Sequence, residues 1–446
     1  MDNVTIVETS TPRVWRIAGT HTWPCDSCLM NSTVSARVFR RRRFVAAVTA
    51  IVVVGSAGYS TAALSQPMPT VTAAITVPVV ETSAASQIAW PSVGRGALGA
   101  VGFDGVLSSS GGEDPFPIAS LTKVITSLVV LDHKPIAAGE NGPKIDITDD
   151  DVQWLDDSIA ENGSWEEVVS GSVLTQRQVL EAMMLPSANN YSKTLVIWAF
   201  GSVDEFLGAT QTWLDKHGLT GTTLTNSSGL GASNVSTTRD LVEIGKLALA
   251  NPVLASVVSE KTAILPDIGE IKNLNSLLGT AGITGMKTGT DDASGSCILF
   301  SAVVPVGDTT VTVVGATLGA VNAGERNAAL LDVLESAPSA FERVQLVTAG
   351  ERVGSYSPDW IGGEEKSSDV VAGADASVLV WKGTTVTAQA KAKPLENGDT
   401  GSKVGSLEFT LSAPALDQPA LISVPLTLAE DIAAPTLWQR LTNPDF

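Results

Sequence analysis

The feature that most restricts the fold of this chain is an uncharged apolar run near its N-terminus. Residues 44–64, FVAAVTAIVVVGSAGYSTAAL, follow directly after four consecutive arginines, Arg40 to Arg43. A helix of about 20 apolar residues crosses the hydrocarbon core of a bilayer, and a basic flank stays on the cytoplasmic side. The pattern therefore predicts one membrane span, with everything after it outside the cytoplasm.

A cleaved signal peptide is the alternative interpretation of this run, because Ser60 to Ala62 fit a small-x-small cleavage site. The run is longer than the roughly 7–15 apolar residues of a signal peptide core, which favours an uncleaved anchor. A buried core helix is disfavoured by the adjacent arginines. Both leading interpretations export the rest of the chain.

The first 43 residues form a basic tail on the cytoplasmic side, with seven arginines against three acidic side chains. Cys25 and Cys28 make a C-x-x-C pair in this tail, but only His21 stands near them. A structural zinc site needs four ligands, so the pair is a weak zinc candidate. Met30 offers a later translation start just before the basic cluster, which leaves open whether residues 1–29 are translated.

The whole chain is acidic, with a formal net charge of −19. A strongly acidic protein repels the phosphates of nucleic acids, so no nucleic-acid partner is expected. Three cysteines cannot form a disulfide framework. Cys297, the only cysteine beyond the apolar run, lies in the apolar stretch SCILF and is expected to be a small buried core residue.

The exported part divides by composition into three regions. Residues 65–89 are rich in Pro, Thr and Ala, which is typical of a flexible linker. Residues 90–343 run from strand-like to helical and back to strand-like patterns, with a closing helix over 325–344. This order predicts an α+β domain, an antiparallel sheet with helices on it. Residues 344–446 hold short β-rich runs between turns, which predicts a small β-sandwich-like domain.

A serine and a lysine three positions apart, Ser120 and Lys123, lie on the apolar stripe of PIASLTKVITSLVV. Positions i and i+3 share one face of a helix, so the two side chains can touch. A neutral amine can take the proton of a serine hydroxyl, and burial lowers a lysine pKa enough to make it neutral. A surface lysine beside an incidental serine is the simpler alternative for this pair alone.

Two further short motifs each occur once in the chain. Ser187 and Asn189, in MMLPSANNYS, combine a hydroxyl that can relay a proton with an amide that can both donate and accept. Taken alone, such a pair is more often explained by a helix cap or a turn. Lys287 to Thr290, in GMKTGT on an expected strand, can bind a carboxylate, while Gly289 lets a substrate backbone approach the strand edge. A tight turn is the alternative there.

In the order S-x-x-K, S-x-N and K-T-G, with motif starts 67 and 100 residues apart, these signals match the set of class A β-lactamases and penicillin-binding proteins. The chain resembles the low-molecular-mass penicillin-binding proteins that are serine D-alanyl-D-alanine carboxypeptidases. Around the motifs, GEDPFPIASLTKVIT, SSGLGASNVSTTRDLV and NLNSLLGTAGITGMKTGTDDASGSC are also similar to this family. The resemblance covers residues 92–342, and extends more loosely over the β-rich C-terminal region.

This resemblance implies a β-lactamase/penicillin-binding transpeptidase-like fold, with helices on both faces of the antiparallel sheet, a helical subdomain and a C-terminal β domain. It also implies hydrolysis of the last D-alanine from peptidoglycan stem peptides that end in D-Ala-D-Ala, and covalent binding of β-lactam antibiotics. No cofactor and no metal are implied. The protein would act at the cell membrane, held by its N-terminal span.

Carried over position by position, the resemblance implies a role for each motif residue. Ser120 would be the acylated nucleophile, Lys123 its base, Ser187 a proton relay and Asn189 the group that orients Lys123 and the substrate amide. Lys287 would add positive potential. Thr288, Gly289 and Thr290 would bind the substrate, with the two hydroxyls on its terminal carboxylate, and the backbone N–H groups of Ser120 and Thr290 would form the oxyanion hole.

The sequence departs from the family pattern after the second motif, where Asn190 and Tyr191 replace the Asp-Ala pair of many relatives. This change could alter the cleft wall and substrate choice. The choice between carboxypeptidase and endopeptidase activity stays open, as does the oligomeric state. A β-lactamase is disfavoured, because its Glu-x-x-Leu-Asn element is missing between the second and third motifs. A non-catalytic wall-binding protein is disfavoured by the complete motif set.

Overall fold

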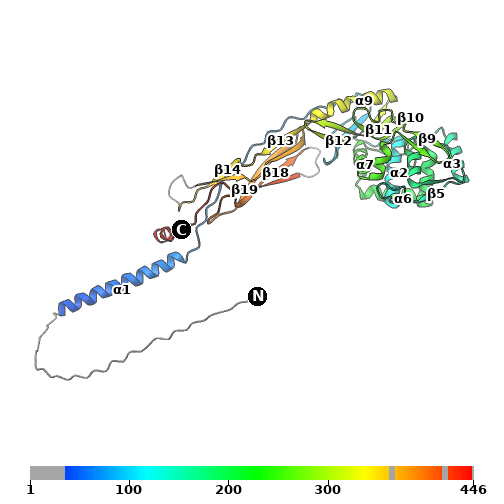
Figure 1. Cartoon of the computed structure of the whole chain (residues 1–446). Helices are drawn as coiled ribbons and strands as arrows, with labels where there is room; N and C mark the ends of the chain where they lie inside the picture. Colours follow the sequence, from blue (N-terminus) through cyan, green and yellow to red (C-terminus); the bar gives the residue numbers. More distant parts are fainter. Residues whose placement is uncertain (1–35, 361–366, 414–419, 444–446) are drawn as a thin grey trace, which may run out of the picture. The chain divides into compact units, whose positions relative to one another are not determined.

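The computed structural model describes residues 36–360, 367–413 and 420–443 (Figure 1). It divides into two compact units, one formed by Met1–Met68 with Pro435–Phe446 and the other by Pro69–Ala434. The tail residues Cys25, Cys28 and Met30 lie outside the described residues, and the predictions made for them remain predictions.

The smaller unit is built around one long helix, α1 (Ala36–Leu64). The part from Val38 to Leu64 is long and apolar enough to cross a bilayer, and nearly all of its side chains up to Tyr59 are exposed. The helix begins before the apolar run, because arginine is a good helix former and the arginine cluster extends it.

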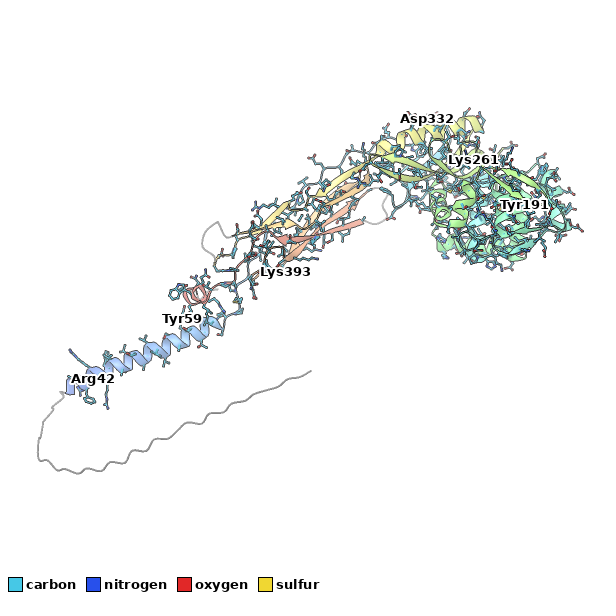
Figure 2. The ribbon with its side chains drawn as sticks, in the orientation of Figure 1. Arg42, Tyr59, Tyr191, Lys261, Asp332 and Lys393 are labelled. Atoms are coloured by element: carbon cyan, nitrogen blue, oxygen red, sulfur yellow. The ribbon has the colours of Figure 1, made fainter. Side chains whose placement is uncertain are left out.

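A short C-terminal helix, α10 (Leu437–Thr442), contacts the end of α1. Arg440 donates from Nη2 to the carbonyl of Leu64 at 2.8 Å, and Tyr59 donates its hydroxyl to the carbonyl of Leu441 at 2.8 Å (Figure 2). The last carbonyls of a helix have no partner within the helix, and a guanidinium there also favours the negative end of the helix dipole.

The larger unit contains a five-stranded antiparallel sheet with the strand order β10-β11-β12-β2-β3. Its strands are β2 (Arg95–Ala100), β3 (Ser108–Ser110), β10 (Ile283–Asp291), β11 (Gly295–Val306) and β12 (Thr309–Ala320). Strand β10 forms one edge, so the K-T-G motif has no further strand beside it in this sheet. An edge strand leaves backbone groups available for a substrate.

Helices cover both faces of this sheet, as expected for the α+β fold, which is confirmed. Helices α7 (Thr238–Ala250) and α8 (Pro252–Ser259) share a core with Leu299 of β11. Helix α9 (Ala323–Ser336) shares a second core with the neighbouring Phe300. Successive strand residues point to opposite faces, so the two cores lie on opposite sides of the sheet.

A helical subdomain packs next to this sheet in the larger unit. Its helices are α2 (Thr122–His133), α3 (Asp149–Ala160), α4 (Gln176–Met184), α5 (Asn189–Phe200) and α6 (Val203–Lys216). Helix α2 is the central one, since ten of its residues are buried and it contacts α4, α5, α6 and α7. Small two-stranded antiparallel sheets border the helices. They pair β4 (Phe116–Pro117) with β7 (Val235–Ser236), β5 (Lys144–Asp146) with β6 (Val173–Thr175), and β8 (Thr262–Leu265) with β9 (Gly269–Lys272).

Between α9 and α10, the described part of the C-terminal region consists mainly of β-strands, which agrees with the expected C-terminal β domain. A six-stranded sheet has the order β1-β14-β15-β19-β18-β17, and β13 pairs with β16 in a second sheet. The strands are β1 (Ala74–Ile75), β13 (Phe341–Val347), β14 (Arg352–Tyr356), β15 (Ser368–Ala372), β16 (Ala376–Trp381), β17 (Thr385–Ala392), β18 (Lys403–Ser412) and β19 (Ala420–Leu428).

The segment expected to be a flexible linker, residues 65–89, is extended but hydrogen-bonded to the C-terminal β region. Val71 exchanges backbone hydrogen bonds with Leu395 at 2.8 and 3.0 Å, and β1 pairs with β14. Further along, the N–H of Ser83 donates to Glu342 at 2.8 Å. The composition of residues 65–89 did not indicate these hydrogen bonds, because their partners lie in the distant C-terminal β region.

The closing helix is also shorter than the expected 325–344. Helix α9 ends at Ser336, and Pro338 lies in the 3₁₀ turn η2 (Ala337–Ala340) that follows. Proline lacks the N–H that a helix interior requires. Residues from Phe341 onward form strand β13 instead.

Candidate active site

Ser120 lies on a 3₁₀ turn, η1 (Ala119–Leu121), immediately before α2. The turn is held by tight backbone packing, because a Cβ at Gly229 would collide with the carbonyl oxygen of Ala119. Ala119 itself adopts a positive φ of 44°. The serine is therefore placed at the start of α2 by a strained turn and a close glycine contact, and its side chain stays only partly buried.

The side chain of Lys123 is completely buried, with an exposed fraction of 0%. Its Nζ atom lies 3.1 Å from Ser120 Oγ, 2.7 Å from Asn189 Oδ1 and 2.8 Å from the carbonyl oxygen of Ser228. No acidic side chain in the described chain forms an ion pair with it. A buried ammonium without a counter-ion is unfavourable, so the site favours the neutral amine.

The pKa of Lys123 is lowered well below its usual value, first by burial and then by the positive charge of Lys287. A neutral amine has two N–H donors and one lone pair. Asn189 Oδ1 and the Ser228 carbonyl can only accept, so they take both donors. The lone pair is then left facing Ser120, whose hydroxyl can donate to it, which is the geometry of a general base beside its nucleophile.

The second motif enters the site at the start of α5. Asn189 is the first residue of this helix, and its Oδ1 atom contacts Lys123. Ser187, two residues earlier, is 3% exposed and has a φ of 66°, in the left-handed region. A serine in this region is uncommon and marks a constrained turn. Asn189 therefore contacts Lys123 directly. Ser187 lies near the site because it is two residues before Asn189 in the chain.

The third motif lies on β10 next to Ser120. A Cβ at Gly289 would come within 3.0 Å of the backbone nitrogen of Ser120, so the strand and the turn are in close contact. Lys287 is 2% exposed, and its ammonium donates to the carbonyl of Thr288 at 2.9 Å. Burial, together with the charge of Arg326, lowers the pKa of Lys287 to about 7.

Arg326 was not singled out from the sequence, yet it belongs to this cluster. It projects from the first turn of α9, is 4% exposed and donates from Nη1 to Ser296 Oγ at 3.2 Å. Ser296 lies opposite Thr290 in the β10–β11 pair, and the two hydroxyl oxygens are 3.3 Å apart. A buried cation is thereby connected to the hydroxyl of Thr290. An arginine on an amphipathic helix gives no signal of this in the sequence.

The Ser228 carbonyl is a second contributor that sequence reasoning did not identify. The loop that presents it is organised by two asparagines. Asn226 Oδ1 accepts from the N–H groups of Ser228 at 3.1 Å and Gly229 at 2.7 Å. Asn234 in turn donates to Asn226 O at 2.9 Å and to Thr122 Oγ1 at 3.1 Å. The loop is thus tied to α2, which aims the carbonyl at Lys123.

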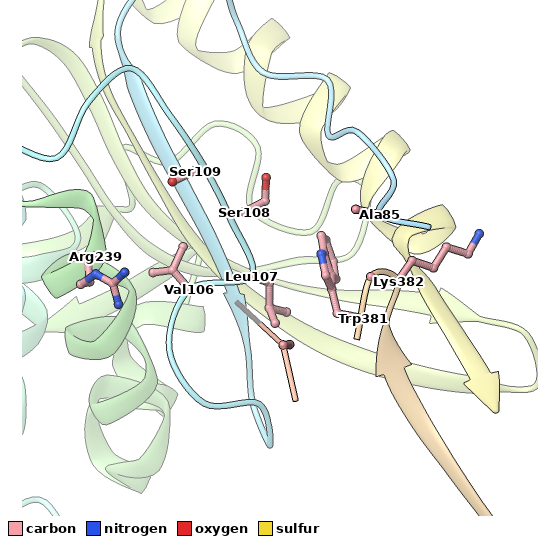
Figure 3. A pocket seen from close by; sticks show the side chains of 10 residues that line it. Ala85, Val106, Leu107, Ser108, Ser109, Arg239, Trp381 and Lys382 are labelled. Carbon is pink, nitrogen blue, oxygen red and sulfur yellow. The ribbon is translucent and has the colours of Figure 1, made fainter. Parts of the chain in front are cut away.

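The cluster is distinct from the pockets elsewhere in the larger unit. The pocket of about 310 Å³ in Figure 3 is lined by residues such as Val106, Arg239 and Trp381, and by none of the motif residues. Among the described residues, no group of three His, Cys, Asp or Glu side chains could hold a metal ion. The groups available for chemistry at the site are the hydroxyl of Ser120, the buried amines of Lys123 and Lys287, and the buried guanidinium of Arg326.

The chain is similar to known proteins named D-alanyl-D-alanine carboxypeptidases. A family model described as D-alanyl-D-alanine carboxypeptidase matches residues 104–320. The D-alanyl-D-alanine carboxypeptidase DacB2 of Mycobacterium tuberculosis is 35% identical over 185 residues, which are 40% of this chain and 59% of that protein. The D-alanyl-D-alanine carboxypeptidase DacC of Escherichia coli is 27% identical over 346 residues, covering 71% of this chain and 80% of that protein.

The fold is also found in a solved structure. The crystal structure of the D-alanyl-D-alanine carboxypeptidase DacD from Francisella tularensis superposes with a TM-score of 0.54 and 19% identity, and covers 80% of this chain and 97% of that one. The match therefore includes more than the region of the three motifs.

Proposed function

Because this chain belongs to the family of serine D-alanyl-D-alanine carboxypeptidases, we propose that it removes the terminal D-alanine of peptidoglycan stem peptides ending in D-Ala-D-Ala. The observation that carries this proposal is the contact of 3.1 Å between the fully buried amine of Lys123 and Ser120 Oγ. A β-lactam, which carries a reactive amide and a nearby carboxylate, would acylate the same serine.

In the acylation step, Lys123 Nζ accepts the proton of the Ser120 hydroxyl as Oγ bonds to the carbonyl carbon of the penultimate D-alanine. The carbonyl π electrons move to oxygen, and the backbone N–H groups of Ser120 and Thr290 stabilise the oxyanion. Removing one such donor typically costs about 10²–10³ in kcat. Close packing of Gly289 against the Ser120 nitrogen supports this placement.

The tetrahedral intermediate then collapses, and the C–N bond to the last D-alanine breaks. The proton on Lys123 passes to the departing amine nitrogen, with the Ser187 hydroxyl as the relay. Asn189 holds the lysine and the substrate amide in place. Water then attacks the ester, gives its proton to Lys123, and releases the shortened peptide while Ser120 Oγ is reprotonated.

The free carboxylate of the substrate would bind at Lys287 and the hydroxyls of Thr288 and Thr290. Arg326 supports this assignment, because it adds a second buried positive charge connected to Thr290 through Ser296. Within the described part of the chain, neither Lys287 nor Arg326 forms an ion pair with an acidic side chain. Two buried basic groups of this kind would favour an anionic substrate terminus over a neutral or amidated one.

The test is covalent labelling by a fluorescent penicillin, with Ser120→Ala as the control. We expect labelling of the wild type only, and equal labelling of both proteins would overturn the assignment. A parallel assay of D-alanine release on monomeric and crosslinked wall fragments distinguishes carboxypeptidase from endopeptidase activity. Folded protein that releases no D-alanine from either fragment would favour a non-catalytic wall-binding role.

For location, we propose that α1 anchors the protein in the cell membrane and leaves the catalytic unit on the outer side. The apolar length of α1 and the arginine cluster at its N-terminal end support this orientation. The contacts of Arg440 and Tyr59 tie the C-terminal helix to the outer end of the span. A cleaved segment would instead give a secreted protein.

A further inference from the structure

A short segment between α3 and β6, residues 161–167, lies against the start of α5. We call it the cover segment. Asn162 takes a positive φ of 56° as the chain leaves α3, and Gly163 then donates its N–H to the carbonyl of Ser158 at 2.9 Å. These contacts turn the chain across the first residues of α5, where the second motif lies.

Three consecutive residues of α5 hold the cover segment by hydrogen bonds. Asn189 donates its N–H to the carbonyl of Ser164 at 2.8 Å. The Asn190 side chain accepts from the N–H of Glu166 at 3.3 Å and donates to the Glu166 carbonyl at 3.0 Å. The next residue also takes part.

Tyr191 donates its hydroxyl to the carbonyl of Glu167 at 2.8 Å. Asn190 and Tyr191 are each 1% exposed, so the side-chain ends of these bonds are buried, while the backbone of Glu166 and Glu167 lies nearer the surface. Breaking these bonds is costly, because the buried side-chain groups of Asn190 and Tyr191 would be left unsatisfied. The cover segment is therefore fixed in position by residues directly after the S-x-N motif.

Gly163 of the cover segment touches the catalytic amide. A Cβ at this position would collide with Nδ2 of Asn189, whose Oδ1 accepts from Lys123 at 2.7 Å. The nearest other atom outside Asn189 would be the Ser158 carbonyl oxygen at 3.3 Å. The bare Cα of Gly163 thus defines one side of the space that the Asn189 amide occupies, and the Lys123 amine lies on the other side.

We propose that the cover segment is a positioning element of the active site, in which Gly163 fixes the amide of Asn189 and thereby the amine of Lys123. Asn190 and Tyr191 act as positioning residues, because they hold Gly163 against Asn189. This inference rests on the proposed function, since it concerns the geometry of the same nucleophile and base. It gives Asn190 and Tyr191 a role in catalysis without substrate contact.

The deciding variant is Gly163→Ala. The added methyl group meets the end of a flexible side chain rather than backbone, so the protein is expected to fold while the Asn189 amide moves. A displacement on the order of 1 Å at a catalytic group can cost about 10²-fold in rate. We expect the second-order rate constant for acylation by a fluorescent penicillin to fall by roughly 10- to 100-fold.

The pH profile separates positioning from a general structural effect. The groups facing the Lys123 amine are Ser120, Asn189, the Ser228 carbonyl and the charged Lys287. The ammonium form depends more on the bond to Asn189 than the neutral amine does. Moving the amide away is therefore expected to shift the acid limb of the acylation profile to lower pH.

Gly208→Ala is the matched control, since Gly208 lies in α6 and a Cβ there would meet no heavy atom within 4 Å beyond the neighbouring backbone of its own helix. Tyr191→Phe, which removes only the hydroxyl bonded to Glu167, should give a smaller rate loss of the same kind. Wild-type acylation rates in Gly163→Ala would overturn the inference. A slower Gly163→Ala with a lowered melting temperature and an unmoved acid limb would do so as well. Absence of acylation in the wild type would instead refute the proposed function.

Discussion

Gly289 of β10 and Ser120 of the turn before α2 are in such close contact that a single methyl group on Gly289 would lie 3.0 Å from the Ser120 nitrogen. The same methyl group would lie 3.1 Å from Ala119 Cβ and 3.3 Å from the Ile118 carbonyl oxygen. Real Cβ contacts are rarely so short, so either the strand or the turn must move. The spacing between the strand edge and the nucleophile therefore depends on a glycine at this position.

We expect Gly289→Ala to reduce acylation of Ser120 by about 10²-fold, the usual cost of losing one oxyanion donor. The reason is that the strand edge is pushed away from the Ser120 N–H. Stopped-flow acylation by a fluorescent penicillin measures the rate, and thermal unfolding checks that the fold persists. An unchanged rate in a folded variant would show that this backbone contact does not form part of the oxyanion hole.

Lys287→Gln tests the electrostatic coupling between the two buried lysines. The positive charge of Lys287 lowers the pKa of Lys123, so its removal makes Lys123 easier to protonate. Lys123 acts as a base only when neutral, and a higher pKa therefore moves the acid limb of the acylation profile to higher pH. Lys391→Gln, at an exposed position on β17, is the control. A shift in the opposite direction, or none, would contradict the coupling.

Binding of a carboxylate should change the protonation of Lys287. Its pKa of about 7 in the unliganded protein means that it is partly neutral between pH 7 and 8. A bound carboxylate favours the ammonium and raises this pKa, so binding takes up protons in that pH range. Calorimetry of the Ser120→Ala protein with a D-Ala-D-Ala peptide, in buffers of different ionisation enthalpy, measures the uptake. Proton release, or no buffer dependence, would place the carboxylate elsewhere.

The local parts of the site could be predicted from the sequence, because they depend mainly on residues that are close together in the chain. Ser120 and Lys123 are one helical turn apart, and the structure brings their side chains to 3.1 Å. The strand character of the K-T-G region was also predictable from its pattern, and it forms β10. The α+β class followed from the order of strand-like and helical segments.

The parts of the site and fold that the sequence did not predict depend on contacts between segments that are far apart in the chain. The Ser228 carbonyl is a backbone group, so no residue type at position 228 marks it as a ligand of Lys123. Arg326 reaches the site only because α9 packs on the sheet that carries Ser296. In the same way, residues 71 to 76 form backbone hydrogen bonds with residues more than 270 positions further along the chain, and amino-acid composition cannot indicate such pairing.

The role of α1 as a membrane anchor is tested by comparing the full-length protein with a form that lacks residues 1–64. We expect the full-length protein to stay in the membrane fraction after alkaline carbonate washing, because about 20 apolar residues in a helix span the bilayer core. A form that begins at Ser65 should be recovered in the soluble fraction and keep its penicillin labelling. If expression of the complete sequence instead gives a soluble protein whose N-terminus lies just after Ala62, the cleaved signal peptide is favoured.

Arg326→Met isolates the contribution of the buried guanidinium to substrate binding. The side chain is 4% exposed and has no acidic partner among the described ion pairs, so its charge is available to an incoming carboxylate through Ser296 and Thr290. Charge-assisted interactions are worth roughly 1.5–3 kcal/mol, which corresponds to about a 10- to 150-fold rise in KM for a D-Ala-D-Ala peptide. We expect a smaller change in kcat, because Ser120 and Lys123 are untouched. Methionine nearly preserves the side-chain volume, and thermal unfolding should show a folded protein.

Steady-state kinetics with a D-Ala-D-Ala peptide and with its C-terminal amide tests whether Arg326 recognises the carboxylate. If it does, the preference of the enzyme for the acid over the amide is lost in the variant. A variant that retains the full preference would show that Lys287 and the threonine hydroxyls alone recognise the carboxylate.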